Sequence, residues 1–455
     1  MKVTSVNPCT EDVNGAFALL DKDEALRICG HVKEESHLWR ELTVNQRAER
    51  FRKLASVMRE NKDEYAKLMT QEMGKPMTQA LGEIEKCAWT SDFFADNAER
   101  WLADEQVEME GRKSAVTFTP IGVVLCVMPW NFPFWQLMRC AIPAMLAGNV
   151  CILRHSNVVP MCAMAIESAF KLAGFPENSF RTLLTDHKTV EAMVASDFVD
   201  GVSVTGSVEA GKTIASAAAA ALKKVVLELG GSDPFIVLES ADIEEACKGA
   251  AEGRLINSGQ SCICAKRFIV VEKRAAAFIA GLTKRMKQAK VGDPIDVITE
   301  VGPLASAQQL KTAVRQVRSS VSKGAKVKCG GGRLGKRGFF FNPTVMVNVD
   351  ADMPIWKEEV FAPIAPVMVV KDREEAIKVA NESEFGLGAS VWTKNQLDGE
   401  VVARRLDAGM VYINEVEKSD PRLPFGGTKK SGLGRELSRY GLLEFVNIKP
   451  VVAKL

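Results

Sequence analysis

The sequence has few histidines, no long apolar run and almost no excess charge, and each shortage excludes a class of protein. Its four histidines lack the spacing of a metal site and stand at positions 31, 37, 155 and 187. The longest apolar stretches, 121–130 and 141–153, are too short or too interrupted to span a bilayer. The 59 basic and 57 acidic side chains leave a formal charge of +2, and the basic residues are scattered. We therefore expect no bound metal, no membrane segment and no nucleic-acid partner.

Cysteine is plentiful, but its distribution does not fit a secreted disulfide scaffold. The eleven cysteines are an odd number and are spread from Cys9 to Cys329 without a dense framework. The first fifteen residues contain Pro8 and acidic side chains where a signal peptide has an apolar run. These features predict a protein of the reducing cytoplasm.

The length and the apolar pattern predict an α/β protein with two or three domains. A chain of 455 residues exceeds what one hydrophobic core usually organises. Residues 15–105 place apolar side chains three and four apart, as amphipathic helices do. From about residue 115, apolar runs alternate with alanine-rich helical segments, which favours a parallel sheet covered by helices.

Two such alternating units are expected, with a boundary near Gly230 and Gly231. The last residues read as a helix end followed by an extended tail, a shape often used to pair with a partner subunit. The strand-like runs are 121–129, 150–155, 199–206, 233–240, 266–272 and 367–372, and a helix is expected over 272–290.

The most informative local feature is Cys262 in the segment NSGQSCICAKRF, residues 257–268. A thiol in an open, polar loop that contains glycine can ionise and attack, whereas a cysteine on an apolar strand is usually inert. The acidic run LELGG, 227–231, supplies Glu228 as a candidate base. Alone, the pair is equally compatible with a cysteine hydrolase, or with a small buried cysteine and a salt-bridged strand end.

A second motif points to phosphate. Residues 206–213, GSVEAGKT, match the phosphate-binding loop GxxxxGK[ST], follow a strand-like run and open a helix. A nucleotide hydrolase that uses Lys212 is therefore a remote alternative, although no metal-binding aspartate at a strand end is evident. Both interpretations share a strand-to-helix turn whose free N–H groups and helix dipole attract phosphate.

A third motif lies at residues 119–140, where a strand breaks at Pro129 and a helix begins near Pro133. Asn131 falls at the break, where its amide is able to donate to a developing oxyanion or simply to cap the helix. In that helix, Trp135 and Arg139 share one face at positions i and i+4.

Taken together, the motifs resemble the NAD(P)-dependent aldehyde dehydrogenase family over essentially the whole chain. The matches keep the family order and are PWNFP at 129–133, TGS at 205–207, ELGG at 228–231, GQSC at 259–262, EEVFAP at 358–363 and LPFGGTKKSGLGRE at 423–436. The segments PWNFPFWQLMR, LELGGSDPF and KSDPRLPFGG are most similar to the compact bacterial and cyanobacterial succinate-semialdehyde dehydrogenases. The resemblance implies the aldehyde dehydrogenase fold: a Rossmann-type cofactor domain, an α/β catalytic domain and a small oligomerisation arm.

The resemblance implies a catalytic role for three residues. Cys262 would attack the aldehyde as a thiolate, and the Asn131 amide with the Cys262 backbone N–H would hold the oxyanion. Glu228 would accept a proton from the water that hydrolyses the thioester, or from the thiol earlier. A carboxylate with its unperturbed pKa of about 4.3 is a weak base, so burial is expected to raise the pKa of Glu228. A coenzyme A acceptor is disfavoured because Glu228 suits water.

The resemblance also implies the cofactor, NADP or NAD. Its expected binding residues are Trp130, Arg154, Ser156, Asn157, Gly206, Ser207, Glu359 and Phe361. Arg154 stands where the family usually has lysine, and Asn157 stands where an acidic residue would repel a 2′-phosphate, so NADP is preferred. In the alternative, Arg154 only replaces lysine on the ribose hydroxyls. Ala362 is a second departure, since it replaces the usual glycine.

Substrate residues carry over from the succinate-semialdehyde enzymes. Arg139 is expected to bind the far carboxylate of a short semialdehyde, with Trp135 on the same face and Ser419 at a substrate-contacting loop position. In the alternative, Arg139 is a surface or interfacial residue that does not contact the substrate. Other small aldehydes, such as glutarate semialdehyde or lactaldehyde, remain alternative substrates, and a non-catalytic structural role is a third class of function.

Two further expectations follow from the sequence. Cys264, two residues after the nucleophile, is a candidate redox partner that would trap Cys262 in a strained disulfide; ordinary loop packing is its alternative. The resemblance implies a homodimer or homotetramer with a cofactor-binding domain over 1–110 and 126–229, a catalytic domain over 230–415, and an oligomerisation arm over 111–125 and 436–455.

Overall fold

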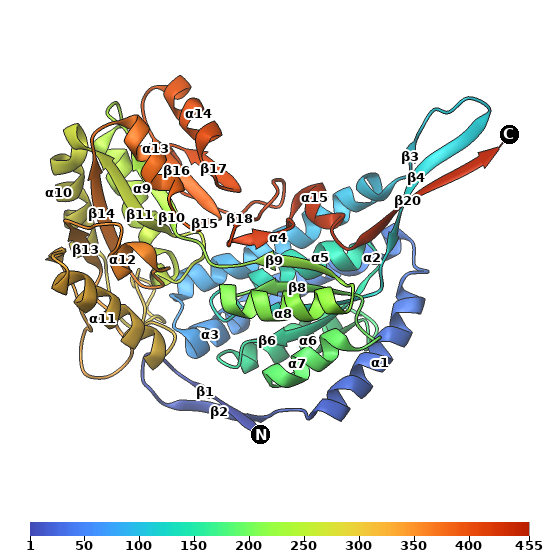
Figure 1. The fold of residues 1–455 in the computed structure, drawn as a ribbon. Helices are drawn as coiled ribbons and strands as arrows, with labels where there is room; N and C mark the ends of the chain where they lie inside the picture. Colours follow the sequence, from blue (N-terminus) through green and yellow to red (C-terminus); the bar gives the residue numbers. More distant parts are fainter. Residues whose placement is uncertain (455) are drawn as a thin grey trace.

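The molecule has two large sheets covered by helices and a projecting arm built on a three-stranded sheet (Figure 1). The structure is a computed structural model that describes residues 1–454. An N-terminal hairpin of β1 (Lys2–Val6) and β2 (Val13–Ala18) precedes four helices: α1 (Lys22–Trp39), α2 (Val44–Glu60), α3 (Lys62–Met73) and α4 (Met77–Leu102). Thr43 and Gln46 form a capping box that starts α2, and Asp21 caps α1. The helices expected over residues 15–105 are confirmed, except that the first residues of that range belong to β2.

The first sheet has six strands and carries the sequence motifs at its carboxyl edge. Its order is β19 (Gly432–Leu433), β9 (Lys224–Glu228), β8 (Gly201–Thr205), β5 (Val123–Met128), β6 (Val150–His155) and β7 (Phe180–Thr182). All neighbours are parallel except β19, which runs antiparallel to β9. The accompanying helices are α5 (Trp135–Leu146), α6 (Pro160–Leu172), α7 (His187–Ala195) and α8 (Val208–Ala220).

The strand order of this sheet reverses between β5 and β8. From β5 the chain steps outward to β6 and β7, then returns to β8 on the other side of β5 and continues to β9. A crevice opens at such a point outside the carboxyl ends of the strands. The loops that begin at Pro129 and Gly206 leave these two strands at that place.

The second sheet has seven strands and begins after the glycine pair at 230–231. Its order is β12 (Lys326–Cys329), β13 (Thr344–Val347), β14 (Ile364–Val370), β11 (Ala265–Val271), β10 (Asp233–Val237), β16 (Gly388–Trp392) and β17 (Met410–Ile413). Only β12 is antiparallel to its neighbour. The helices of this half are α9 (Ile243–Leu255), α10 (Glu272–Gln288), α11 (Ala307–Ser322), α12 (Pro354–Lys357), α13 (Arg373–Asn381) and α14 (Gln396–Arg405).

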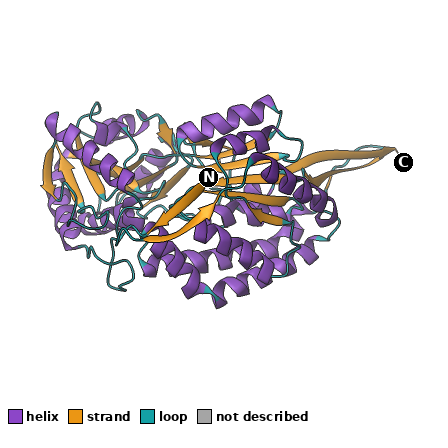
Figure 2. Ribbon diagram, turned by 90° about the horizontal axis from the view of Figure 1, so that it is seen from below, coloured by secondary structure: helices purple, strands orange, loops and turns teal. Residues whose placement is uncertain are grey.

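An arm of extended chain leaves the body of the molecule (Figure 1, Figure 2). It pairs β20 (Val446–Lys454) with β4 (Arg112–Pro120) over nine residues, with β3 (Glu105–Gln106) on the other edge. Short elements complete the chain: η1 (Ile256–Gly259), β15 (Phe385–Gly386), β18 (Thr428–Lys429) and α15 (Ser438–Leu442). The expected strands and the helix over 272–290 are confirmed, and the extended tail is β20.

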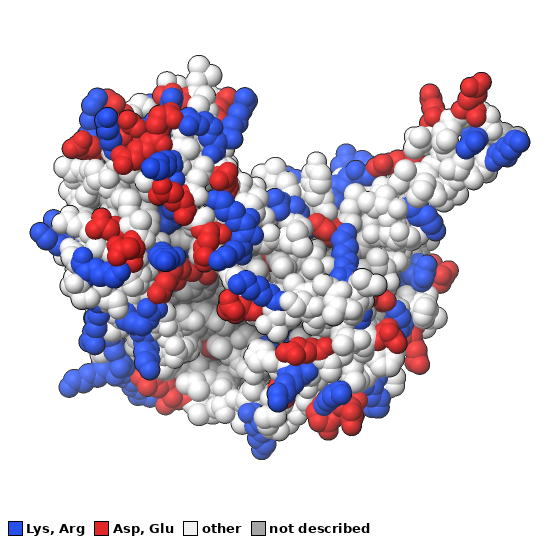
Figure 3. Space-filling model, viewed as in Figure 1, with Lys and Arg blue, Asp and Glu red and all other residues white. Residues whose placement is uncertain are grey.

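The surface mixes charges of both signs. Figure 3 shows Lys and Arg interspersed with Asp and Glu on this face, which is hollowed between the two sheet-bearing halves. No helix within residues 1–454 has the length and apolar character needed to cross a bilayer.

Candidate active site

Cys262 lies on a tight turn between α9 and β11. Asn257, Ser258 and Gly259 have φ angles of 50°, 58° and 78°, so three successive residues adopt the left-handed region. A Cβ on Gly259 would stand 2.4 Å from the carbonyl carbon of Ala362, which explains why glycine is needed there. Such strained backbone is typical of functional sites because the surrounding contacts must hold it.

The turn is tied to the loop that follows β5. The Asn257 side chain donates to the Asn131 carbonyl at 2.7 Å, and the Asn131 side chain donates to the Gln260 carbonyl at 3.0 Å. Gln136 donates to Asn131 Oδ1 at 2.9 Å. Asn131 is buried and held at both ends of its amide, and its second N–H is free to donate. This places a preorganised donor beside the Cys262 turn.

Cys262 stands between two cavities. One, of about 250 Å³, is lined by Lys86, Phe132, Trp135, Ser419 and Phe425 among others. The other, of about 260 Å³, is lined by Trp130, Asn131, Gly206, Glu228 and Phe361 among others. Cys262 and Gln136 line both. A thiol at this position is able to touch one molecule in each cavity at once.

Glu228 ends β9 in the second cavity. Its side chain is buried, and neither carboxyl oxygen has a hydrogen-bond partner among residues 1–454. Burial, reinforced by the nearby Glu436, raises the pKa of Glu228 well above its ordinary value, while Arg139 acts in the opposite direction. An unpartnered carboxyl group with a raised pKa is suited to exchanging protons near pH 7.

Burial also raises the pKa of the Cys262 thiol, to about 12, although Arg139 and Lys266 oppose the shift. Lys266 is buried below the turn and donates to the Cys262 carbonyl oxygen. This raised pKa favours the protonated thiol at neutral pH. Proton removal must accompany attack, which gives an adjacent base a defined task.

Arg139 lines the first cavity and is already engaged by other side chains. Its guanidinium is buried, paired with Glu436, and lies 4.1 Å from the centre of the Phe425 ring. A second nitrogen faces Thr205 Oγ1 at 3.5 Å. The cation thus already has a carboxylate partner, which the sequence spacing could not reveal, and the role of Arg139 as a carboxylate clamp stays a prediction. Trp135 and Arg139 do share α5, as expected.

The first cavity also contains a cation that the sequence did not single out. Lys86, on α4, donates to Ser419 Oγ at 2.7 Å, and its ammonium lies 4.3 Å from the centre of the Trp135 ring. In the sequence Lys86 looks like an ordinary surface lysine of an amphipathic helix. Its partners are far away along the chain, so no local signal marks it.

The second cavity collects most of the expected cofactor residues. Gly206 and Ser207 form the turn into α8, Ser207 caps that helix, and the space where a Cβ of Gly206 would stand is open. Trp130 and Phe361 meet edge to face at 5.9 Å. A helix N-terminus with aromatic walls fits a dinucleotide, whose pyrophosphate would bind at the N–H groups of α8.

Glu359 lies at the far side of this cavity. Its carboxylate accepts from the Gly231 N–H at 3.0 Å and from Lys266 at 3.0 Å. A Cβ on Gly230 would come within 2.4 Å of Glu359 Oε2, so glycine is required for this approach. Glu359 is thus held in place with its charge balanced.

Three expected cofactor residues lie outside this cavity, at the end of β6. The Arg154 guanidinium is buried and donates to the Thr185 carbonyl at 3.2 Å. Burial lowers the pKa of Arg154, with Asp186 opposing the shift. Ser156 and Asn157 form the turn after β6, and they are only partly buried. The structure thus leaves Ser156 and Asn157, rather than Arg154, as the accessible groups of this segment.

The match to a nucleotide-hydrolase loop is wrong. Helix α8 begins at Val208, so Gly211, Lys212 and Thr213 are helical and do not wrap a phosphate. Gly211 packs against Leu229, and Lys212 is exposed and faces Glu209 at 3.4 Å. The one part of that interpretation that the structure keeps is the turn at Gly206, whose N–H groups are suited to bind phosphate.

The structure does not bring Cys264 toward Cys262. Cys264 is buried, and its thiol faces the carbonyl oxygens of Ile256 at 3.7 Å and Arg254 at 4.0 Å. All eleven cysteines are free. A disulfide between the two would require the strained turn to rearrange, so the redox switch stays a prediction without support from the geometry.

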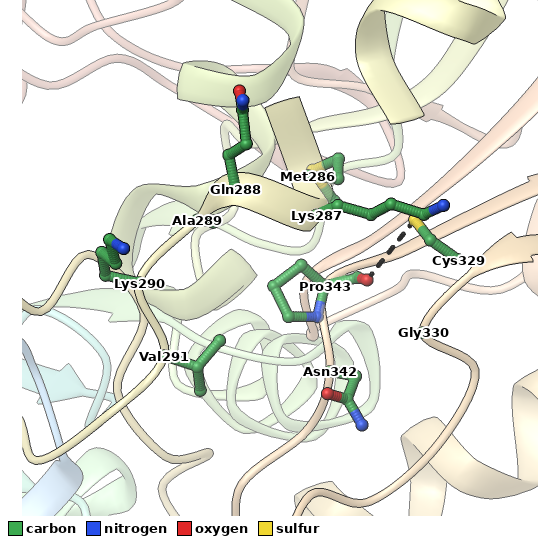
Figure 4. Close-up of a pocket in the computed structure, with 10 residues that line it drawn as sticks. All are labelled: Met286, Lys287, Gln288, Ala289, Lys290, Val291, Cys329, Gly330, Asn342 and Pro343. Carbon is green, nitrogen blue, oxygen red and sulfur yellow. Dashed lines mark hydrogen bonds between the residues drawn. The ribbon is translucent and has the colours of Figure 1, made fainter. Parts of the chain in front are cut away.

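A separate cavity of about 750 Å³ lies between the end of α10 and the β12–β13 hairpin (Figure 4). Cys329 there faces the Pro343 carbonyl at 3.7 Å, and Lys287 and Lys290 lie at its rim. It contains none of the residues expected for catalysis, cofactor or substrate.

The chain is similar to known proteins over nearly its whole length. The model of the aldehyde dehydrogenase family matches residues 1–451. The chain is 46% identical over 451 residues, 99% of each chain, to a protein of Synechocystis sp. named "Probable succinate-semialdehyde dehydrogenase", NADP(+). It is 41% identical to the "Succinate semialdehyde dehydrogenase" Sad of Escherichia coli, NAD(P)+, over 98% of this chain and 97% of that one.

Among solved structures, the succinic semialdehyde dehydrogenase of Streptococcus pyogenes in complex with NADP+ superposes with a TM-score of 0.96. That protein is 36% identical, and the match covers 99% of both chains.

Proposed function

Because the chain belongs to the aldehyde dehydrogenase family, we propose that it oxidises a short semialdehyde, succinate semialdehyde, to the dicarboxylic acid with NADP as hydride acceptor. The observation that carries the proposal is the place of Cys262 at the junction of two cavities. One cavity holds a lysine ammonium, and the other holds the expected nicotinamide-side residues. The relatives' names and the NADP+ complex of the Streptococcus enzyme support the substrate and the cofactor.

The first half of the reaction forms a covalent adduct on Cys262. The sulfur attacks the aldehyde carbon, a C–S bond forms, and the carbonyl electrons move to oxygen while the thiol proton passes to Glu228 or solvent. Asn131 donates its free N–H to the developing oxyanion, together with the Cys262 backbone N–H. The oxyanion electrons re-form the C=O bond as the hydride leaves the same carbon with its bonding electrons, so that a thioester remains on Cys262. Bound NADP would supply the hydride acceptor, held by the expected residues of the second cavity.

The second half of the reaction hydrolyses the thioester. A water oxygen attacks the acyl carbon, its proton passes to Glu228, and the C–S bond breaks to return the Cys262 sulfur. Glu228 fits this role because it is buried, unpartnered and lies in the same cavity as Cys262. The net change converts aldehyde, NADP and water into acid, reduced NADP and a proton.

Cofactor preference is proposed to rest on the turn after β6. Asn157 carries no negative charge to repel a 2′-phosphate, and Ser156 and Asn157 are only partly buried. Arg154 is buried and donates to the Thr185 carbonyl in the loop after β7, so it is not proposed to grip the phosphate. NAD is proposed as a weaker alternative.

The arm is proposed to join copies of the chain into a dimer or tetramer. Eight of the nine residues of β20 are exposed, and Ile448, Val451 and Val452 are among them. A projecting strand with exposed apolar side chains is an edge that a second chain is able to cover. The free state of all eleven cysteines supports a reducing cytoplasmic location.

The proposed function is tested with a panel of aldehydes and both cofactors. We expect the highest kcat/KM with succinate semialdehyde and NADP, lower values with glutarate semialdehyde and lactaldehyde, and reduction of activity by roughly 10⁴-fold or more in Cys262→Ala. Cys329→Ala, which removes a thiol far from the site, serves as the matched control. Absence of aldehyde-dependent reduction of either cofactor would contradict the proposal.

A further inference from the structure

Two buried acids near the Cys262 turn have no role in the reaction described above. Asp233 begins β10, Glu417 lies in the loop between β17 and β18, and both side chains are buried. None of their four carboxyl oxygens accepts a hydrogen bond from an N–H or hydroxyl group among residues 1–454. Burying two carboxylates without donors is costly, so the pair must be stabilised in another way.

The two carboxyl groups face each other across Gly388. A Cβ on that glycine would overlap Glu417 Oε2 and would lie 3.0 Å from Asp233 Oδ2, so glycine leaves the space that the pair occupies. Two adjacent carboxylates repel when both are ionised, and one proton held between them removes the repulsion. Glu417 is the donor of the resulting hydrogen bond, and Asp233 is the acceptor.

The surrounding charges favour one carboxylate and one neutral acid. Four charged side chains act on the pair: the cations Lys266, Arg254 and Arg267, and the anion Glu359. Burial raises the pKa of both acids, and Asp233 raises that of Glu417 further, whereas Lys266 opposes each shift. The cations therefore stabilise the Asp233 carboxylate, and Glu417 keeps the proton that it donates.

Glu417 is part of the wall between two cavities. It lines the cavity of about 250 Å³ beside Cys262, and it also lines a cavity of about 920 Å³ to which α9 and the end of α10 contribute. Asp233, at the other end of the hydrogen bond, lies against the Cys262 turn. A Cβ on Gly231 would stand 2.8 Å from both Asp233 Oδ1 and the Cys262 carbonyl oxygen. The pair thus joins the cavity wall to the turn that carries the nucleophile.

We propose that Asp233 and Glu417 are positioning residues of the substrate cavity: the proton that Glu417 donates to Asp233 holds the loop 414–420 against the Cys262 turn. The proposal deepens the proposed function and rests on it, because the wall acts through the aldehyde that it encloses. Without this hydrogen bond the loop has no buried polar contact through Glu417, and the wall between the two cavities loosens. Aldehydes then bind less well whether or not they carry a charge.

Two variants at Asp233 separate the hydrogen bond from the charge, because alanine and asparagine are both neutral and only asparagine still accepts from Glu417. Asp233 does not line the cavity beside Cys262, so neither change alters that cavity directly. At pH 7 we expect Asp233→Ala to speed amide hydrogen exchange of the peptide 414–420 by roughly 10-fold, the scale of one lost hydrogen bond to a charged group. Asp233→Asn should exchange at close to the wild-type rate.

The same variants are compared in steady-state oxidation of succinate semialdehyde and of butanal, which has the same four carbons and no carboxylate. Asp233→Ala should raise KM for both aldehydes by a similar factor, roughly 10-fold, with a much smaller effect on kcat. Asp233→Asn should restore both KM values. Glu415→Ala removes an exposed acid from the same loop and is the matched control, for which wild-type exchange and kinetics are expected.

The shared proton is itself open to measurement by infrared spectroscopy. At pH 8, where exposed carboxyl groups are ionised, the difference spectrum between the wild type and Glu417→Gln should contain the C=O stretch of one protonated carboxyl group. Absence of that band would overturn the proposal. Wild-type exchange in Asp233→Ala, or equal losses in Asp233→Ala and Asp233→Asn, would overturn it as well.

The exchange and infrared measurements need no substrate. If the wild-type protein oxidises neither aldehyde, the proposed function is contradicted, and these two measurements still decide whether the acid pair holds the loop.

Discussion

The carboxyl group of Glu228 lies in the field of a cation, Arg139, and of a second acid, Glu436. Arg139 is paired with Glu436, and both act on Glu228 across the end of β9: Glu436 raises its pKa and Arg139 lowers it. The balance makes the proton affinity of Glu228 depend on the Arg139–Glu436 pair. Arg139 therefore influences the charge of the site in addition to its predicted contact with the substrate, which stays a prediction.

We expect Glu228→Gln to slow thioester hydrolysis so far that hydride transfer becomes much faster than hydrolysis. Loss of a general base typically costs about 10²–10⁴-fold. Stopped-flow measurement of reduced cofactor should therefore show a burst of about one equivalent per active site followed by slow turnover. In the wild type, steady-state turnover should fall as pH decreases through the raised pKa of Glu228, because the protonated acid cannot accept a proton.

Glu209→Gln, at an exposed acid on α8, is the control for that experiment and should show wild-type kinetics. If the burst and the steady rate fall by the same factor in Glu228→Gln, the carboxylate acts before hydride transfer, and its assignment to hydrolysis is wrong.

At the scale of elements, α4 determines where α5 begins. Glu83 on α4 accepts from the backbone N–H groups of Phe134 and Trp135, both at 3.0 Å, at the start of α5. Lys75, buried against the Phe132 ring at 3.7 Å, balances the charge of Glu83. This acid therefore substitutes for the N-cap side chain that α5 lacks. The loop carrying Asn131 is fixed by the same contact.

We expect Glu83→Gln to lower the free energy of unfolding by about 3–5 kcal/mol, because it leaves the Lys75 cation buried without a counter-charge. The double variant Lys75→Met and Glu83→Gln should recover much of the loss, since the amide oxygen that replaces the carboxylate still accepts from α5 and no charge remains. Urea unfolding of the single and double variants measures both effects. Equal destabilisation of the single and the double variant would show that the loss of free energy comes from the weakened contact of residue 83 with the start of α5 and not from the unpaired Lys75.

The sequence predicted elements whose signals are local and missed contacts between distant elements. The apolar runs of β5, β8 and β11 and the turns at Pro129 and Gly206 are short-range patterns, and they place Asn131 and Cys262 at element ends. In contrast, β19 is only two residues long and pairs with β9 through Gly432, whose Cβ would stand 2.2 Å from the Leu227 carbonyl oxygen. No periodicity marks so short a strand.

The same limit applies to the two cations near the site. The resemblance and its spacing from Trp135 made Arg139 a candidate for the substrate carboxylate, whereas nothing in the sequence singled out Lys86. The pairing of Arg139 with Glu436 and the contact of Lys86 with Ser419 each join residues about 300 positions apart. Only the folded arrangement shows which cation is already neutralised.

At the scale of the whole molecule, the arm is the part least explained by a single chain. Strand β20 pairs with β4 on one edge, projects from the body, and exposes Ile448, Val451 and Val452 by about half (Figure 1). Such a strand gains little stability from the rest of its own chain because few side chains of the body cover it. Its length and exposure are accounted for if a second copy packs against it.

We therefore expect the double variant Ile448→Asp and Val452→Asp to shift the protein to a smaller species in light scattering after size-exclusion chromatography. These two side chains lie on one face of β20, four residues apart, so the charges replace one apolar stripe. Lys449→Asp changes charge on the same strand without removing an apolar contact, and it should keep the wild-type mass. A wild-type mass in the double variant would exclude the arm as the interface that holds the copies together, whereas a smaller species with retained activity would show that each copy contains a complete site.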